Sequence, residues 1–297
     1  MTMGLTTAVS RGVIDVKFRR LVIVGSSGFV GSSILKASRN SEFETVGVSR
    51  SQIDLCTPNA DQELAALLRE DDAVIFCAAD APCKNLKSLE INLEIALCFV
   101  RAVAKKQIRY LINVSSDAVY QDSSNPLVES SPTAPNNWHG SMHSAREAIL
   151  NATGIATMHL RPTLIYGSGD PHNGYGPNQF LSRARSGTDI ELFGDGEELR
   201  DHVHITDVAT AALGLLRVGA TGALNVASGE TRSFKEIAER VVTLSPVRIR
   251  IVNKPRPGPM PHGGFRPISI DKCCALLPSF VPIPVLQGVQ MEMSLNG

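Results

Sequence analysis

The chain has 297 residues, enough to bury a full hydrophobic core, and its 29 Lys and Arg balance its 29 Asp and Glu. Because there is no basic surplus, the composition predicts neither a nucleic-acid partner nor attraction to an anionic membrane. The sequence contains no run of the roughly 18 apolar residues that a membrane span requires.

Residues 1–18 do not show the charged and then apolar layout of a signal peptide, so we interpret them as an N-terminal extension. The six cysteines form no C-x-x-C pair, and no histidine lies at a spacing suited to zinc. We therefore expect reduced structural thiols, no metal centre and a cytoplasmic protein.

From Arg20 onward the chain alternates strand-like and helix-like segments. Short apolar runs rich in β-branched residues predict strands, and stretches with helical spacing lie between them. A repeated pattern of this kind is typical of a parallel sheet with right-handed crossovers. The predicted strands are 21–24, 45–48, 73–77 and 111–114, and the predicted helices are 30–38, 61–69 and 89–105.

After Leu160 the pattern becomes richer in loops. Residues 166–177 hold four glycines and two prolines, and 255–267 is too rich in Pro and Gly for a regular element. A strand is predicted within 219–226 and a helix at 233–244. We predict an α/β fold, a Rossmann-type doubly wound parallel sheet with a smaller C-terminal substrate-binding lobe. The expected division is 19–165 with 203–230 for the sheet domain, and 166–202 with 231–297 for the lobe.

Gly25, Gly28 and Gly31 follow the first predicted strand directly and open the first helix. In this context the first glycine permits a tight turn, and the second lets backbone N–H groups approach a pyrophosphate. The third lets helix and strand pack closely. The spacing therefore predicts a dinucleotide site, the alternative being a glycine turn without a ligand.

The end of the second predicted strand indicates the kind of dinucleotide, because an acidic residue there binds a ribose 2′-hydroxyl and repels a 2′-phosphate. Here that strand runs into Ser49, Arg50 and Ser51. A guanidinium flanked by hydroxyls suits a 2′-phosphate, so we predict NADP, with NAD as second choice. The alternative for Arg50 is a solvated surface charge.

Several segments, in order, carry a recognisable set of motifs. The most specific is L-F-G-D-G-E-E-L-R-D-H-V-H-I-T-D-V-A at 192–209. The other segments are Ala78-Ala79, Asn92, N-V-S-S-D-A-V-Y at 113–120, R-P-T-L-I-Y-G at 161–167 and N-V-A-S-G-E at 225–230. Together, from about residue 20 to residue 278, the chain resembles the extended short-chain dehydrogenases/reductases, specifically the nucleotide-sugar epimerase, dehydratase and reductase group.

The glycine turn, the strand ends and the resemblance together give one set of expected cofactor contacts. These are Gly25, Ser27, Gly28, Phe29, Val30, Gly31, Ser49, Arg50, Ser51, Asp54, Ala78, Ala79, Asn92, Val114, His143 and Pro162.

The resemblance implies a nucleoside-diphosphate sugar held between two lobes, with hydride transfer between a sugar carbon and the cofactor. In that family a Tyr-x-x-x-Lys pair on one helix and a nearby Ser or Thr assist the proton transfer. Aligned on Glu147, this chain has His139 in place of the tyrosine and His143 in place of the lysine. The hydroxyl position is retained as Ser116, with Asp117 beside it, and these four residues form the expected catalytic set.

The two histidines leave three interpretations open. In the first, His139 is the acid and base, since an imidazole titrates at about pH 6.5 and needs no lysine to act. In the second, both are relics, and the protein binds its cofactor without turnover. In the third, the pair binds a metal ion, although the sequence offers no third ligand. The retention of Ser116, Asp117 and the glycine turn favours altered over lost chemistry.

Three side chains are candidates for binding the substrate. Arg200 ends the segment where the family uses an arginine against the diphosphate, and a guanidinium fork suits phosphate. Asn178 matches a family position near the same diphosphate. Arg266, after two glycines, is expected as a second phosphate ligand, with a surface salt bridge as the alternative for both arginines. Trp138, beside the histidines, either shields the site or belongs to the core.

A family 4,6-dehydratase carries a glutamate after the aspartate, whereas Asp117 is followed by Ala118, which disfavours dehydration. The expected function is an NAD(P)-dependent nucleotide-sugar epimerase or keto-sugar reductase. By analogy with the family we expect a homodimer through the helices at 89–105 and 141–152. The alternative from another class is a catalytically inactive NADP-binding sensor or scaffold of the same fold.

Overall fold

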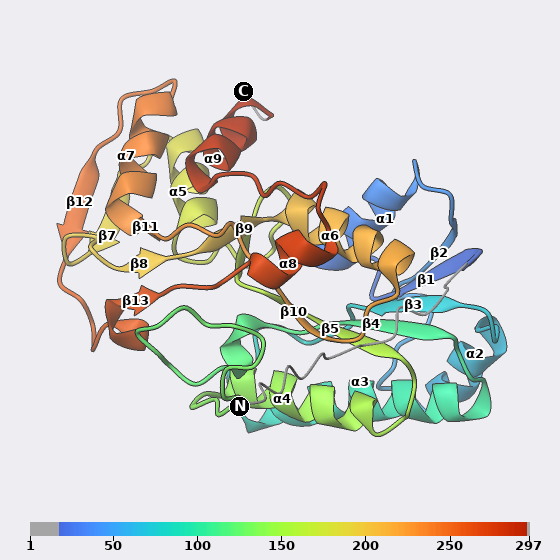
Figure 1. The fold of residues 1–297 in the computed structure, drawn as a ribbon. Coiled ribbons are helices and arrows are strands. Elements are labelled where there is room, and N and C mark those ends of the chain that lie inside the picture. Colours follow the sequence, from blue (N-terminus) through green and yellow to red (C-terminus); the bar gives the residue numbers. More distant parts are fainter. Residues whose placement is uncertain (1–17, 296–297) are drawn as a thin grey trace, which may run out of the picture.

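A computed structural model describes residues 18–295, so residues 1–17 of the expected extension at 1–18 lie outside the described residues. Its centre is a six-stranded parallel sheet in the order β10-β5-β4-β3-β1-β2 (Figure 1). The strands are β1 (Arg20–Val24), β2 (Glu44–Val48), β3 (Ala73–Phe76), β4 (Tyr110–Val114), β5 (Thr157–Pro162) and β10 (Gly222–Val226).

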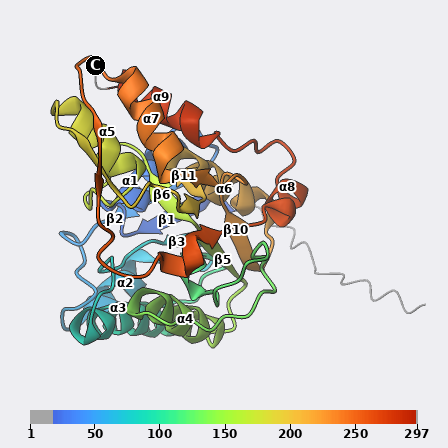
Figure 2. The same cartoon turned by 90° about the vertical axis from the view of Figure 1, so that its left-hand side faces the viewer.

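Helices cover both faces of the sheet (Figures 1 and 2), which confirms the predicted doubly wound α/β fold. One face carries α1 (Phe29–Ser38) and α6 (Ile205–Val218); the other carries α2 (Ala60–Leu67), α3 (Leu86–Lys105) and α4 (Trp138–Asn151). The central strands β1 and β3 are buried along their whole length because both of their faces are covered, and Leu21–Val24 and Ala73–Phe76 are accordingly apolar.

Phe18, expected to end the N-terminal extension, instead belongs to the core of the sheet domain. Its ring is 6 % exposed and stacks on Tyr110, with 5.4 Å between the ring centroids. The sheet domain therefore begins at least one residue earlier than the boundary drawn from the sequence.

A second group of elements lies beyond the carboxyl ends of the strands and has a separate apolar core. Its main helices are α5 (Pro177–Arg185), α7 (Phe234–Leu244) and α9 (Val285–Ser294). The remaining described elements are β6 (Leu164–Tyr166), β7 (Ile190–Phe193), β8 (Leu199–Arg200), β9 (His202–His204), β11 (Arg232–Ser233), β12 (Ile251–Lys254), β13 (Phe265–Arg266) and α8 (Asp271–Leu276). Of these, β9 and α8 contribute Val203 and Cys273 to the core of the sheet domain. None of the described helices is long and apolar enough to cross a membrane.

The segment 255–267 differs from its prediction, because it does contain short regular elements. Pro261–Gly264 forms a turn of 3-10 helix, and β13 pairs in parallel with β8 through Phe265 and Arg266. This pairing places Arg266 directly beside Arg200 in register. The two-residue strand is too short to be recognised from hydrophobic alternation.

The strand order reverses between β1 and β3, since β1 is followed by β2 on one side and by β3 on the other. Open α/β sheets bind ligands at the carboxyl ends of the strands at such a point. The glycine turn follows β1 here, and Ala78 follows β3. The two strand ends approach so closely that a Cβ on Gly25 would lie 2.6 Å from the Ala78 nitrogen.

Candidate active site

Two cavities open at this switch point and share the residues Gly28, Arg50, Cys77 and Ala79. The smaller, of about 340 Å³, lies over the ends of β1 and β2 and is lined by Ser27, Ser49, Asp54 and Ala78 among others. The larger, of about 730 Å³, extends from the glycine turn to the second lobe. Volumes of this order suit small-molecule and cofactor sites.

The glycine turn is built as tightly as the sequence predicts. Gly25 has φ +89°, a left-handed conformation that only glycine adopts without strain. A Cβ on Gly31 would lie 2.2 Å from the Gly25 carbonyl oxygen, so α1 packs against the turn without room for a side chain. The residues present therefore form a cradle that fits a dinucleotide pyrophosphate at the start of α1.

Arg50 is exposed, borders both cavities and has no ion-pair partner among residues 18–295. The Ser49 and Ser51 hydroxyls lie 2.9 Å apart and bond to each other, and the Ser49 hydroxyl also donates to Gln52. A free guanidinium between the two cavities is the feature of this site that suits a 2′-phosphate.

Two of the expected cofactor residues lie outside both cavities, Ser51 and Asn92. The Asn92 side chain is 2 % exposed, and its amide bonds to the backbone N–H and carbonyl of Asp80 at 2.9 and 2.8 Å. Asn92 thus fixes the loop after β3, which itself borders the larger cavity, and has no route to a ligand. The other expected cofactor residues all border one cavity or both.

The position of α4 brings the histidine pair to the larger cavity. Asn137 caps the helix by accepting from the Gly140 N–H at 2.9 Å. Gly140 permits a close approach, because a Cβ there would lie 2.1 Å from the Ala118 carbonyl oxygen. His139 and His143 therefore border the same cavity as Ser116. Trp138 is 46 % exposed and borders neither cavity, so it is not a core residue and does not shield the site.

The two imidazoles contact each other edge to face, with 4.7 Å between their centroids. The Cys83 backbone N–H donates to Nδ1 of His139 at 3.4 Å, which places the hydrogen of the neutral ring on Nε2. Burial lowers the pKa of His139, although the Asp117 carboxylate acts in the opposite direction. Burial, His139 and Arg146 lower the pKa of His143 well below its usual value. Both rings are therefore neutral at pH 7.

No tyrosine from elsewhere takes the place of the missing one, since all four tyrosine hydroxyls are bonded away from His139. Tyr110 and Tyr166 donate to the carbonyls of Ala220 and Val285, and Tyr120 donates to the Asn225 side chain at 2.6 Å. Tyr175 accepts from the Phe193 N–H. Of the described lysines, none borders either cavity.

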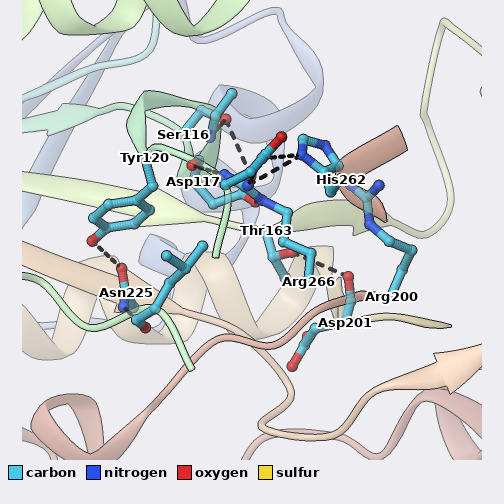
Figure 3. A network of polar contacts seen from close by, with 12 residues as sticks. Ser116, Asp117, Tyr120, Thr163, Arg200, Asp201, Asn225, His262 and Arg266 are labelled. Carbon is cyan, nitrogen blue, oxygen red and sulfur yellow. Dashed lines mark hydrogen bonds and ion pairs between the residues drawn. The ribbon is translucent and has the colours of Figure 1, made fainter. Parts of the chain in front are cut away.

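Ser116 follows β4, and its hydroxyl oxygen accepts from the Ala118 N–H at 3.1 Å, which fixes the side chain at the cavity. Figure 3 shows Asp117 turned toward Arg266. The Arg266 Nε donates to the Asp117 carboxylate at 2.9 Å, and Nη2 donates to the Asp117 carbonyl at 2.7 Å. Nη1 donates to Asp122 at 2.7 Å.

These contacts correct the prediction that Arg266 binds a phosphate and narrow the role predicted for Asp117. Arg266 is 2 % exposed and holds two carboxylates of its own chain, so it is a buried ion-pair partner instead of a second phosphate ligand. Asp117, bonded to a guanidinium, is an ionised acceptor and no proton donor. Both still border the cavity.

Arg200 and Asn178 both border the larger cavity, as expected of substrate ligands. Arg200 also donates to Glu198 at 3.0 Å. The Asn178 amide is engaged by the protein, accepting from the Gly167 N–H at 2.9 Å and donating to Asp170 at 2.7 Å.

Three further histidines that sequence reasoning did not place in the site border the same cavity, His172, His202 and His262. His202 is 2 % exposed, and neither of its ring nitrogens has a partner among the described residues. The resemblance segment contains His202, but nothing in the sequence singles out His262. Within residues 18–295 there is no group of three or more His, Cys, Asp or Glu arranged to hold a metal ion.

Comparison with known proteins agrees with this architecture. The chain is 28 % identical over 326 aligned residues to the dTDP-4-dehydro-6-deoxy-D-allose reductase of Streptomyces bikiniensis, covering 92 % of this chain and 94 % of that one. Among solved structures, the UDP-glucose 4-epimerase of Thermus thermophilus in complex with NAD superposes with a TM-score of 0.81 at 22 % identity, covering 93 % of this chain and 98 % of that chain.

The RMD protein of Pseudomonas aeruginosa, solved in complex with NADPH, superposes with a TM-score of 0.78 at 22 % identity and the same coverage, 93 % and 98 %. The NAD dependent epimerase/dehydratase family matches residues 21–227, which include the whole glycine turn, Ser116, the histidine pair and Arg200. This chain therefore belongs to the NAD dependent epimerase/dehydratase family of enzymes.

Proposed function

We propose that this protein is an NADPH-dependent reductase of a nucleoside-diphosphate keto-sugar, with His139 in place of the family's catalytic tyrosine. The observation that carries the proposal is the position of His139, which borders the same cavity as Ser116 and whose Nδ1 is held by a backbone N–H. A keto-sugar reductase is favoured because the Streptomyces relative, aligned over nearly its whole length, is named for such a reduction.

NADPH is the proposed cofactor because Arg50 stands free between the two cavities. The turn at 25–31 would hold the pyrophosphate, and His143, whose ring borders the larger cavity, would face the nicotinamide ribose. Bound NADPH supplies the hydride that a carbonyl carbon accepts.

His139 and Ser116 supply the electrostatic part of the reaction. The Nε2 hydrogen of the neutral His139 ring is one donor for a sugar carbonyl oxygen, and the Ser116 hydroxyl, whose bond to Asp117 is long at 3.5 Å, is the other. As the carbonyl is reduced, these donors stabilise the negative charge on oxygen, and the oxygen takes its proton from solvent, because a neutral imidazole that gave up its own proton would be left as an anion. Arg200 would bind the diphosphate, which positions the sugar at the histidine.

The test uses purified protein with NADPH and a panel of 4-keto-6-deoxy sugars linked to dTDP, UDP or GDP. A reductase consumes one NADPH for each sugar reduced. His139→Ala is expected to lower kcat by about 10²-fold or more, the range for removing one donor to a developing oxyanion, without changing NADPH affinity. Ser141→Ala, two residues away on the same helix and outside both cavities, serves as the matched control and is expected to retain activity. Full activity of His139→Ala would contradict the assignment of His139.

The same assay separates the two other functions. An epimerase inverts a sugar carbon and returns the hydride, so the sugar changes while NADPH is conserved. A sensor or scaffold binds NADPH, seen as a rise in Tm, and leaves every sugar unchanged.

We further propose that the protein forms a homodimer through α3 and α4, which lie side by side (Figure 1). Three large apolar side chains are exposed on these helices, Leu86 by 58 %, Leu97 by 40 % and Trp138 by 46 %. Large exposed apolar residues on two neighbouring helices favour an interface there. Analytical ultracentrifugation of wild type and Leu97→Glu tests this, since a monomeric wild type would contradict it.

A further inference from the structure

His262 lies in a turn of unusual backbone conformation. His262, Gly263 and Gly264 have φ values of +54°, +62° and +84°, three left-handed residues in succession. Left-handed backbone costs a residue other than glycine about 1 kcal/mol. His262 borders the larger cavity, and its side chain is 21 % exposed. The chain thus has a partly exposed histidine, at a cost in strain, at the border of the substrate space.

The partners of His262 determine which of its nitrogens carries hydrogen. Nδ1 bonds to Oδ1 of Asp122, which also accepts from Nη1 of Arg266 at 2.7 Å. A carboxylate bonded to a guanidinium only accepts, so the imidazole hydrogen lies on Nδ1. Nη1 of Arg266 and Nδ1 of His262, 3.2 Å apart, are then two donors that share one acceptor. The lone pair of His262 is left on Nε2.

The surroundings keep this ring neutral. Burial and the guanidinium of Arg200 lower the pKa of His262, against the hydrogen bond to Asp122. A neutral ring with its hydrogen on Nδ1 offers only an acceptor at Nε2, and an acceptor does not bind a phosphate oxygen. The group that fits it is a hydroxyl.

The larger cavity thus holds two imidazoles of opposite tautomer. His139 receives the Cys83 N–H on Nδ1 and has its hydrogen on Nε2, whereas His262 gives its Nδ1 hydrogen to Asp122 and has its lone pair on Nε2. One ring comes from α4 and the other from the turn before β13. A ligand that carries both a carbonyl oxygen and a hydroxyl has a matching group for each.

We propose that His262 is a substrate-binding residue that accepts a hydrogen bond from a sugar hydroxyl through Nε2, with Asp122 holding its tautomer. This rests on the proposed function, since the hydroxyl belongs to the sugar of the nucleotide sugar. His262 then determines which sugars are bound, because a sugar lacking that hydroxyl leaves the acceptor unpaired in a partly desolvated site.

His262→Asn is the sharpest test. The Asn amide places a donor where Nδ1 is, so the contact with Asp122 is retained, but it has nothing at the position of Nε2. Asparagine also tolerates left-handed backbone. Gly258→Ala, in the same segment and with no atom within 4 Å of the added Cβ, is the matched control.

Calorimetry measures the binding of NADPH, of the nucleoside diphosphate alone and of the nucleotide sugar turned over by the wild type. We expect His262→Asn to bind the first two normally and the nucleotide sugar about 10-fold more weakly, the worth of one hydrogen bond. Nucleotide sugars that lack one hydroxyl complete a double-mutant cycle with His262→Asn. Removing the hydroxyl that His262 binds should weaken binding to the wild type and have no effect on binding to the variant.

Unchanged affinity of His262→Asn for the nucleotide sugar would overturn the proposal. An equal loss with the nucleoside diphosphate alone would also overturn it, because the contact would then be to the diphosphate side of the ligand. Failure of the proposed function is a separate result, since in that case the wild type itself binds NADPH and no nucleotide sugar.

Discussion

Replacing Gly31 by alanine perturbs the cofactor cradle by an amount that follows from the geometry. The added Cβ would lie 2.2 Å from the Gly25 carbonyl oxygen, whereas ordinary contacts begin at 3.4 Å. The turn and α1 must therefore separate by the difference, about 1.2 Å. Overpacking of this kind costs about 1–3 kcal/mol of stability. Because hydrogen bonds from the turn to a pyrophosphate would lengthen by a similar distance, NADPH affinity should fall by about 10²-fold.

Substitutions at two other glycines distinguish the loss of stability from the loss of NADPH affinity. A Cβ on Gly28 meets only the Gly25 carbonyl oxygen, at 3.4 Å, so Gly28→Ala should fold normally and lose affinity only through contact with the cofactor. Gly258→Ala adds a methyl group in open space and should change neither quantity.

The assay combines thermal unfolding without ligand and a titration with NADPH. Gly31→Ala should lower both Tm and affinity, Gly28→Ala affinity alone, and Gly258→Ala neither. If Gly31→Ala retains wild-type affinity, the close approach of α1 to the turn is not what builds the site. Loss of stability in Gly28→Ala equal to that of Gly31→Ala would refute the separation of the two roles.

Three further substitutions test other parts of the structure. Arg50→Ser should lower the affinity for NADPH by about 10-fold or more in a binding titration and leave the affinity for NADH unchanged, since a charged hydrogen bond is worth about 1.5–3 kcal/mol. Equal losses of affinity for NADPH and NADH would contradict the assignment of Arg50 to the 2′-phosphate. Burial lowers the pKa of His202 to about 3, so the folded protein loses up to about 1.4 kcal/mol per pH unit as pH falls from 6.5 toward 3. His202→Phe should abolish this loss and raise Tm by removing two unpartnered nitrogens. His204 and Ser168 hold the pKa of Glu292, despite its burial, at about 2, so its contribution of about 3 kcal/mol is complete above pH 4.5 and is lost as pH falls through 2. Glu292→Gln should unfold more easily at pH 7 and lack that acid-dependent loss in denaturant titrations.

The strands that the sequence predicted carry no charged residue and are mostly apolar. β5 was missed because Thr157–Pro162 contains His159 and Arg161, which argue against a buried strand. The structure buries both by pairing them. His159 lies 3.1 Å from the Asn113 amide, and Arg161 forms two hydrogen bonds to Glu147. Polar partners 14 and 46 residues away leave no local pattern for sequence reasoning to detect.

The residues of the candidate site also divide into those indicated by contiguous motifs and those whose partners are distant in the sequence. His139, His143 and Ser116 were found because they align with a family motif on contiguous segments. Arg266 was misassigned because its partner Asp117 is 149 residues away, and a lone arginine after glycines looks free in the sequence. His262 was missed for a similar reason, since its tautomer depends on Asp122 across 140 residues.

A buried cation on α4 bears on why a neutral histidine suits position 143. Arg146 is 2 % exposed, and its three donor groups bond to the carbonyls of Phe76 and Ala78 and to the Asn113 side chain, at 2.7–2.8 Å. These acceptors are neutral, so its positive charge is not cancelled by them. Burial lowers the pKa of Arg146 only to about 10, and the group stays charged at pH 7.

Residues 143 and 146 are three apart on α4 and therefore lie on one face of the helix. A lysine at 143 would place a second buried cation beside Arg146, which is costly without a carboxylate to pair with it. With a catalytic tyrosine that cost is offset, because the nearby ammonium lowers the pKa of the tyrosine hydroxyl from about 10. An imidazole at 139 titrates lower and gains nothing from the ammonium. If His139 acts in place of a tyrosine, as proposed, a neutral His143 is the less costly neighbour for Arg146, and the two positions are physically coupled.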